Sequence, residues 1–175
     1  MAPIKKINAG ALRARLESLF IYNESSGTFT YAFTRGRFVV GTKSGSMTSK
    51  GYRTIMIDGR QYRAHRLVWL WHTGEWPDQE IDHINGQKDD NRFINLRLAT
   101  SQQNNANRAP TRQNTSGLKG VSLNQRRGKW YAMIRMNGKN RHLGSFSTKE
   151  EAHKAYQTAA LAEFGPFAYL GPRHD

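Results

Sequence analysis

A polar stretch at residues 106–117, ANRAPTRQNTSG, most constrains what this chain can fold into. It contains Asn, Thr, Pro and Arg and almost nothing that a core could bury, which is typical of a linker. The chain of 175 residues is therefore expected to form two small modules, and its 37% content of apolar residues suits small cores. We predict a first module over residues 1–108, a linker at 109–115 and a second module over residues 116–170.

Charge is distributed unevenly along the chain. Lys and Arg number 27 against 13 Asp and Glu, and residues 91–149 hold twelve bases and no acid. Such an excess favours a polyanionic partner, either nucleic acid or an anionic membrane. The longest apolar cluster spans only residues 67–71, whereas a membrane-spanning helix needs roughly 18 apolar residues. Nucleic acid is therefore the expected partner, with no membrane and no small-molecule cofactor.

The chain contains no cysteine, which excludes disulfides, thiolate zinc sites and cysteine nucleophiles and fits a reducing compartment. The first twenty residues carry charges throughout and no apolar segment, so they are not expected to form a secretory signal. A cytoplasmic location is expected, in a bacterial host or for a phage-encoded protein. Any metal must be held by His, Asn, Asp, Glu or carbonyl oxygen.

Periodicity and turn residues predict the elements of both modules. The dipeptides Asp58-Gly59 and Asn137-Gly138 each mark a two-residue hairpin turn, and Thr148 with Glu151 forms a capping box. The first module is expected to contain helices at 9–20, 65–73 and 101–107 and strands at 28–33, 52–57, 61–64, 80–84 and 96–99. The second is expected to contain strands at 119–123, 129–137 and 140–146, followed by one helix.

The chemically dense stretch is residues 80–105, EIDHINGQKDDNRFINLRLATSQQNN. Asp82 and His83 are adjacent in a predicted strand, so they point to opposite faces unless the strand bends or ends there. This arrangement suits a carboxylate that holds a hard cation and an imidazole that reaches a water molecule. Asn95 precedes the next strand and Asn104 begins the following helix. The four side chains are therefore placed to surround one metal ion and one phosphate.

Residues 50–108 resemble the HNH homing-type endonucleases with the ββα-metal fold. The matching motifs are Y-R-A-H-R-L-V, D-H-I-N-G, D-N-R-x-x-N-L-R and A-T-x-x-x-N. The resemblance implies that His83 is the general base that activates water and that Asn95 orients this histidine. It further implies that Asp82 and Asn104 bind one divalent metal ion. Asn104 stands where the final histidine of the family name would be, and oxygen ligands suit Mg²⁺ or Mn²⁺.

Other polar residues of this module have less specific roles. His65 and His72 are seven residues apart on one helix face and are candidate metal ligands, but a structural histidine bonded to backbone or carboxylate is the preferred interpretation. Asp89, Asp90 and Asn91 are interpreted as an ordinary charged turn, and Asn91 is assigned no catalytic role.

Residues 116–170 resemble an AP2/ERF-type DNA-binding domain through G-V, G-K-W-Y-A-x-I-R, L-G-x-F-x-T-x-E-E-A and A-Y. The resemblance implies that the face of a three-stranded sheet contacts DNA, with the following candidate residues: Arg127, Lys129, Trp130, Arg135 and Arg141. Alternation along the strand places Trp130 and Arg135 on opposite faces, so one of the two is expected to pack instead.

The predicted fold class is α+β, a ββα-metal nuclease module followed by a small three-stranded antiparallel sheet with one helix. The predicted function is that of a site-selective, divalent-metal-dependent endonuclease of the homing or phage type, acting on double-stranded DNA. Two alternatives are a non-catalytic AP2-type regulator with a decayed nuclease module and a basic structural protein bound to RNA or the ribosome. The oligomeric state is left open.

Overall fold

The computed structural model describes residues 8–171 and divides into two compact units, the first ending at Leu98 and the second beginning at Ala99. This division lies ten residues before the linker expected at 109–115. Ala106 explains the difference, because it is buried in a cluster with Ile134 and Tyr156, and its carbonyl accepts a hydrogen bond from the Tyr169 amide at 3.1 Å. Packing therefore assigns the helix before the polar stretch to the second unit.

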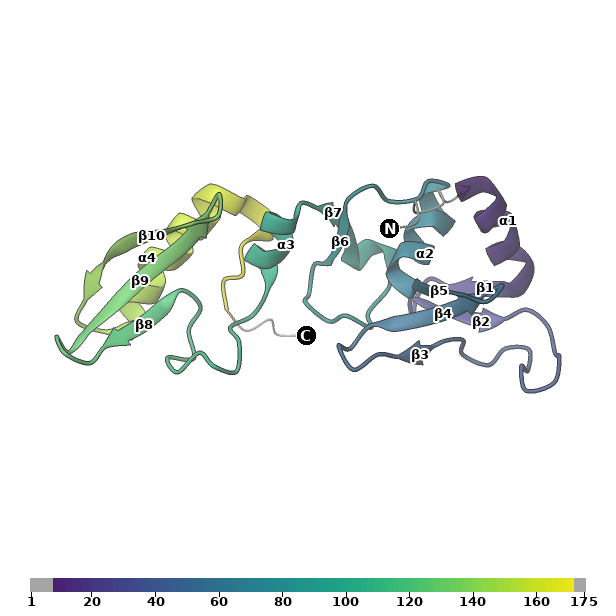
Figure 1. The fold of residues 1–175 in the computed structure, drawn as a ribbon, viewed down its shortest axis with the longest axis horizontal. Helices are drawn as coiled ribbons and strands as arrows, with labels where there is room; N and C mark the ends of the chain where they lie inside the picture. Colours follow the sequence, from purple (N-terminus) through teal and green to yellow (C-terminus); the bar gives the residue numbers. More distant parts are fainter. Residues whose placement is uncertain (1–7, 172–175) are drawn as a thin grey trace, which may run out of the picture. The chain divides into compact units, whose positions relative to one another are not determined.

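The first unit consists of helices and three small sheets (Figure 1). One sheet pairs β1 with β2, a second has the order β3-β4-β5, and the third pairs β6 with β7. The elements in chain order are α1 (Ala9–Leu19), β1 (Phe20–Asn23), β2 (Thr28–Tyr31), β3 (Ser46–Met47), β4 (Arg53–Ile57), β5 (Arg60–Arg63), α2 (Ala64–Thr73), β6 (Glu80–His83), the 3-10 helix η1 (Phe93–Asn95) and β7 (Leu96–Ala99).

Local sequence explains these elements. Asp58 and Gly59 adopt positive φ values of 46° and 76°, and this turn joins β4 to β5 as predicted. Gly74, with φ of 77°, ends α2 in the left-handed conformation. The core beneath these elements contains fully buried Leu16, Phe29, Ile55, Leu67 and Leu70. Strands β1 and β3 are absent from the expected elements: the helix expected at 9–20 included the first residue of β1, and β3 has only two residues.

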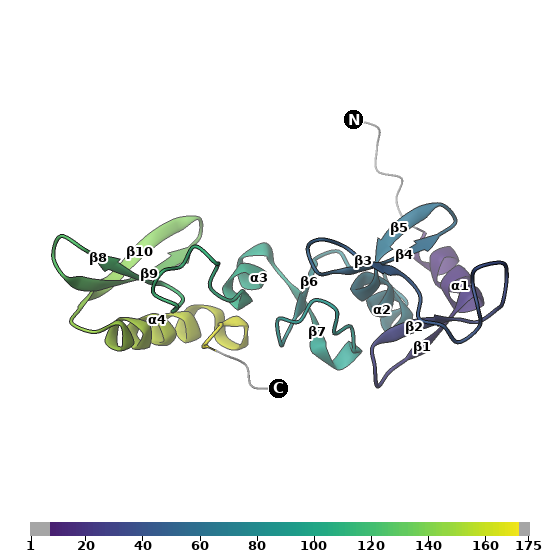
Figure 2. The ribbon, with the colours of Figure 1, turned by 90° about the horizontal axis from the view of Figure 1, so that it is seen from below.

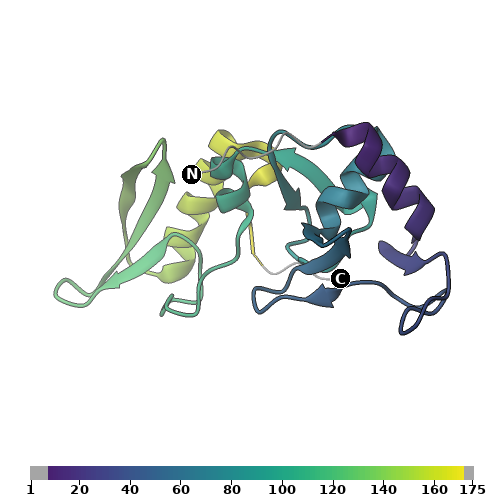
Figure 3. The same cartoon turned by 45° about the vertical axis from the view of Figure 1, so that its right-hand side comes forward.

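The second unit contains one three-stranded antiparallel sheet in the order β10-β9-β8. Figures 2 and 3 show α4 lying along one face of this sheet. Among the described residues of this unit, no helix covers the other face. The elements are α3 (Ser101–Asn107), β8 (Val121–Asn124), β9 (Lys129–Met136), β10 (Lys139–Phe146), α4 (Lys149–Phe164) and the 3-10 helix η2 (Gly165–Phe167).

The predicted turn and cap of the second unit are both present. Asn137 and Gly138 have positive φ values of 48° and 76°, and Thr148 and Glu151 form the capping box of α4. Gly120 is required before β8, because a Cβ there would lie 2.0 Å from a ring carbon of Tyr156. The structure thus confirms a mixed α and β fold with small antiparallel sheets. Within residues 8–171, no helix is long and apolar enough to span a membrane.

Candidate functional site

Strand β6 carries the adjacent pair Asp82 and His83 at its end. Only 4% of Asp82 and 5% of His83 is exposed, so both side chains are buried. The strand ends at His83, which is the condition under which neighbouring side chains need not alternate between faces. Arg97 of β7 donates to the Asp82 carboxylate from Nε at 2.9 Å, and its second nitrogen lies 2.8 Å from the same oxygen. This ion pair fixes the orientation of the carboxylate.

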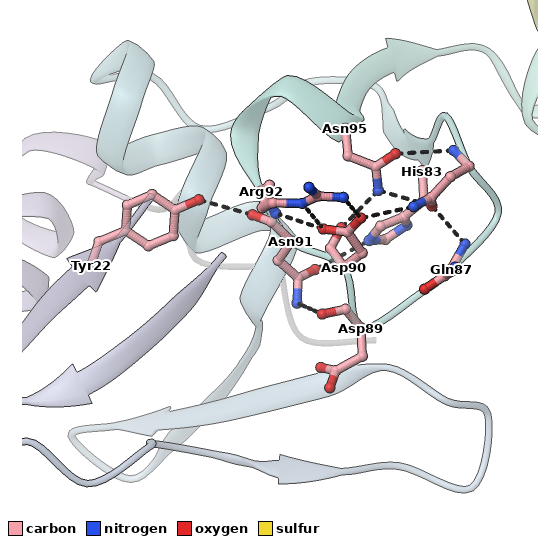
Figure 4. Close-up of polar contacts among 9 residues, drawn as sticks. Tyr22, His83, Gln87, Asp89, Asp90, Asn91, Arg92 and Asn95 are labelled. Atoms are coloured by element: carbon pink, nitrogen blue, oxygen red, sulfur yellow. Dashed lines mark hydrogen bonds and ion pairs between the residues drawn. The ribbon is translucent and has the colours of Figure 1, made fainter. Parts of the chain in front are cut away.

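His83 is held by a side chain that the sequence pattern assigned to an ordinary turn. The His83 Nε2 atom lies 3.1 Å from the Asn91 Oδ1 atom, and only 1% of Asn91 is exposed. Figure 4 shows the Asn91 amide between His83 and Tyr22. Burial lowers the pKa of His83 below its usual value, against the opposing effects of the Asn91 hydrogen bond and nearby Asp82. The ring is therefore neutral at pH 7, the state that a general base requires.

Asn95 was expected to orient His83, and its recorded side-chain hydrogen bonds instead stabilise the loop that follows the histidine. Its Oδ1 accepts from the Asn85 amide at 3.0 Å, and its Nδ2 donates to Asn85 Oδ1 at 3.0 Å and to the Asp90 carbonyl at 2.8 Å. The Asn95 carbonyl also accepts from the Ile84 amide at 2.9 Å. Asn95 thus closes the loop from which Asn91 reaches His83 (Figure 4).

The acidic pair of this loop is engaged in ion pairs. Asp89 accepts two hydrogen bonds from Arg53 of β4, both at 2.9 Å. Asp90 accepts from Arg92 Nε at 2.8 Å and from Asn85 at 2.7 Å, and the Arg92 hydrogen bond lowers the pKa of Asp90. These carboxylates therefore support the loop around Asn91.

The two remaining histidines of the first unit lie in α2 and differ in their surroundings. His65 packs edge-on against His83 with ring centroids 5.1 Å apart, and its buried Nδ1 has no hydrogen-bond partner among the residues that the structure describes. Burial lowers the pKa of His65 to about 3. His72 stacks on Phe93 at 4.2 Å. The preferred interpretation of a histidine bonded to backbone or carboxylate is therefore wrong for His65 Nδ1.

The candidate metal ligands of this chain are few. Within residues 8–171, His, Asp and Glu side chains form no group of three that is arranged to hold a metal ion. Asp82 supplies one carboxylate, and Asn104 lies in α3, a helix whose start is capped by Thr100 and Gln103. Asn104 belongs to the second unit, so its approach to Asp82 stays a prediction. Both donors are oxygen atoms and fit a hard divalent cation rather than a soft one.

The predicted DNA contacts fall on two faces of the second-unit sheet. Along β9, Ala132 and Ile134 are buried against the side of α4, and Trp130 belongs to the same face and packs on that core. Lys129 and Arg135 are exposed on the opposite face, which we call the outer face. Trp130 is therefore corrected from a predicted contact to a packing residue, because its strand position directs it toward the helix.

Strand register corrects Arg141 as well. Arg141 pairs with Ile134 across β9 and β10, whereas Asn140 pairs with Arg135. Directly paired residues of antiparallel strands point to the same face. Arg141 is therefore exposed on the helix side of the sheet and not on the outer face with Arg135. Arg127 is exposed in the turn between β8 and β9.

The outer face also contains residues that the resemblance did not assign. Asn124 Nδ2 donates to the Tyr131 hydroxyl at 3.0 Å, and the rings of Tyr131 and His142 meet edge-to-face at 5.1 Å. Tyr131 lies on the outer face because it shares the alternation of Lys129 and Arg135 along β9. His142 lies on the same face because it pairs with Met133 of β9. Alternation from Arg135 and the hairpin register would have identified these positions from the sequence.

Comparisons with known proteins agree with the buried site. The family model of the HNH endonucleases matches residues 62–106. The chain is 30% identical over 150 residues to an uncharacterized HNH endonuclease of Acanthamoeba polyphaga mimivirus, covering 85% of this chain and 77% of that protein. It is 35% identical over 97 residues to Protein 3.8 of Escherichia phage T7, covering 55% of this chain and 80% of that protein. No solved structure is significantly similar to the chain.

The family model and these relatives define a nuclease. The chain belongs to the HNH endonuclease family. The matched residues 62–106 include α2, β6, the loop around Asn91 and α3. The β1–β2 hairpin and the sheet of the second unit lie outside that match.

Proposed function

We propose that this nuclease hydrolyses phosphodiester bonds of double-stranded DNA at selected sites, as a divalent-metal-dependent enzyme of the homing or phage type. The observation that carries the proposal is the buried His83 next to the buried Asp82 carboxylate. Hydrolysis forms a bond from water oxygen to phosphorus and breaks the bond from phosphorus to the leaving oxygen. The water must lose a proton, and a neutral imidazole near this phosphate accepts it.

The general base is His83, and burial is what prepares it for that role. Because the pKa of His83 is lowered, the ring is unprotonated at neutral pH and ready to take a proton. Proton acceptance of this kind contributes typically about 10²- to 10⁴-fold to rate. Asn95 supports this role by closing the 84–95 loop, since its amide joins both sides of that loop.

Asp82 and Asn104 would hold one Mg²⁺ or Mn²⁺ ion. When bound, such an ion offsets negative charge on the nonbridging and leaving oxygens of the phosphate. Arg97 holds the Asp82 carboxylate through one of its oxygens. We assign β6, β7 and α3 to a ββα-metal arrangement on the basis of their order and the family resemblance.

The second unit would bind DNA through an AP2/ERF-like sheet. Its outer face presents Lys129 and Arg135 with Tyr131 and His142 between them, and Arg127 extends from the adjoining turn. Exposed bases bind phosphates irrespective of sequence, whereas contacts to base edges provide site selection. The absence of acids from residues 91–149 supports this assignment, because an ordinary solvated surface mixes both charges.

Two rival functions both predict no DNA cleavage in the assay that tests the nuclease. A regulator with a decayed nuclease module would bind DNA without cutting it, and a basic RNA- or ribosome-bound protein would show no metal-dependent DNA cleavage. Family membership and the retained Asp82, His83, Asn95 and Asn104 favour the nuclease.

The test is to incubate supercoiled plasmid with the full chain in Mg²⁺, Mn²⁺ or EDTA and to separate nicked, linear and intact forms. Cleavage is expected with a divalent ion and none in EDTA. Asp82→Asn should raise the metal concentration that gives half-maximal cleavage, whereas Asp78→Asn removes the same charge at an exposed position and should not. Equal cleavage in EDTA, or unchanged metal dependence in Asp82→Asn, would refute the metal assignment.

A further inference from the structure

The loop residue Asn91 contacts the proposed general base His83, and Tyr22 of the β1–β2 hairpin contacts Asn91. Neither residue has a role in the function proposed above. We propose that Asn91 is a positioning residue that holds His83 with its proton on Nε2, and that the β1–β2 hairpin keeps Asn91 in place. This inference rests on the proposed role of His83 as the general base. It assigns a catalytic contribution to residues 20–31, which lie outside the matched residues 62–106.

The hydrogen bonds of Asn91 determine which way its amide points. Its Nδ2 donates to the Asp89 carbonyl at 3.2 Å, an atom that can only accept. Its Oδ1 therefore faces His83 Nε2 at 3.1 Å, and this oxygen also can only accept. Nε2 must then carry the proton in the neutral ring, so that the lone pair belongs to Nδ1. Nδ1 is accordingly the atom that receives the proton of water.

Asn91 is in turn held by Tyr22 of β1. The Tyr22 hydroxyl donates to the Asn91 carbonyl at 3.0 Å, as Figure 4 shows. Only 8% of Tyr22 is exposed, and burial raises its pKa to about 12, so the hydroxyl keeps its proton and remains a donor. Its ring packs against Phe29 at 5.1 Å and Trp71 at 6.2 Å, which ties the hydroxyl to the core.

The turn of the hairpin makes a second, independent contact with the same segment. A Cβ at Gly27 would lie 2.3 Å from the Arg92 amide nitrogen and 2.5 Å from the Asn91 carbonyl carbon. Only glycine permits this approach, and its φ of 66° also favours glycine. The hairpin therefore meets the Asn91–Arg92 backbone at its turn and at Tyr22, and both contacts restrict where the Asn91 amide can lie.

The experiment measures the His83 tautomer and the cleavage rate separately. Protein with ¹⁵N-labelled histidine is observed by NMR without metal or DNA, and the His83 signals are identified by their loss in His83→Ala. The expected tautomer in the wild-type chain has the proton on Nε2. Asn91→Ala should lose this preference and lower the single-turnover cleavage rate at saturating enzyme by on the order of 10- to 100-fold, the size of effect seen when a hydrogen-bond partner that orients a metal-ligating histidine is removed.

Tyr22→Phe provides a gentler variant that keeps the aromatic packing and removes one hydrogen bond. Its cleavage rate should fall by roughly 2- to 10-fold, as expected for one hydrogen bond. Tyr31→Phe is the matched control, because Tyr31 lies on β2 of the same hairpin and its hydroxyl makes no hydrogen bond with any described residue. DNA affinity measured in EDTA should change less than about twofold in all three variants, because none removes a charge that binds phosphate.

The outcomes separate this inference from the proposed function. A wild-type His83 with its proton on Nδ1, or Asn91→Ala and Tyr22→Phe chains that retain both tautomer and rate, would overturn the inference. If Asn91→Ala fails to fold, the wild-type tautomer and the comparison of Tyr22→Phe with Tyr31→Phe decide the question. A folded His83→Ala chain that cleaves at the wild-type rate would instead overturn the general-base assignment, whatever tautomer is found.

Discussion

The two units use polar side chains in opposite ways. In the first unit Asp82, His83, Asn91 and Asn95 are each less than one-tenth exposed, and each takes part in a side-chain hydrogen bond. In the second unit, Lys129 and Arg135 stand exposed on the outer face of a sheet. Buried polar groups are costly unless they are paired, so they occupy one geometry, whereas exposed charges act over a distance and tolerate many arrangements. Chemistry needs the first property and DNA capture the second.

His83→Ala should give the largest difference between the units. It should lower the cleavage rate by roughly 10²-fold or more, because general base catalysis is lost, and should leave DNA affinity nearly unchanged. The matched control is His142→Ala on the outer face, which should weaken binding and spare the single-turnover rate at saturating enzyme. Rates measured under single-turnover conditions and affinities measured in EDTA distinguish the two. A rate loss in His142→Ala equal to that in His83→Ala would contradict the division.

The outer face can be compared with the helix side of its own sheet. The double variant Lys129→Gln, Arg135→Gln should flatten the plot of log affinity against log salt by up to about 1.8, or 0.9 for each phosphate contact. Lys139→Gln with Arg141→Gln removes the same charge from exposed positions that pair with the inward-facing Met136 and Ile134. This control should leave the slope unchanged. Equal flattening in both double variants would show that net charge, and not the outer face, sets the affinity.

His65 allows a test of burial through the pH dependence of stability. The pKa of His65 is about 3 in the folded chain, whereas an exposed histidine has a value near 6.5. Below about pH 6.5 the unfolded chain therefore takes up a proton that the folded chain does not, so the free energy of unfolding should fall as pH falls, by up to ~1.4 kcal/mol per pH unit for this residue. Denaturant melts between pH 7.5 and 4.5 measure this slope.

His65→Gln should reduce that slope, and a melt at pH 7.5 separates the loss of the titrating group from any general destabilisation. His83 contributes in the same direction, because burial also lowers its pKa. If His65→Gln leaves the pH dependence of the free energy of unfolding unchanged, the His65 ring takes up its proton in the folded chain as readily as in the unfolded chain.

Short-range patterns predicted most of the fold, and long-range packing determined what they missed. The turns at Asp58-Gly59 and Asn137-Gly138 and the capping box at Thr148 depend on neighbouring residues only, and all were confirmed. The assignment of α3 to the second unit depends on Ala106 meeting Ile134 and Tyr156, which no local pattern shows.

The candidate site divides in the same way. The D-H pair identified Asp82 and His83 because their chemistry is visible in the residue types. Asn91 was overlooked because its proposed role depends on a loop that returns to His83 and on Tyr22 of a hairpin, 69 residues earlier in the chain. The face on which Arg141 lies, by contrast, could have been predicted from the two-residue turn. That turn places Lys139 opposite Met136, and two residues further along each strand it places Arg141 opposite Ile134, on the helix side of the sheet.

The smallest expected effect concerns the helix that supports the outer face. Thr148 accepts a hydrogen bond from the Glu151 amide at 3.2 Å, and Glu151 returns one to the Thr148 amide at 3.2 Å. Thr148→Ala removes the first of these and should destabilise the second unit by about 1 kcal/mol, the usual cost of losing an N-cap. Hydrogen exchange should quicken at α4 amides and stay unchanged at β6, because the cap belongs to the second unit alone. Faster exchange at β6 as well would show that the two units unfold together, and the buried site would then owe part of its stability to the sheet that we propose binds DNA.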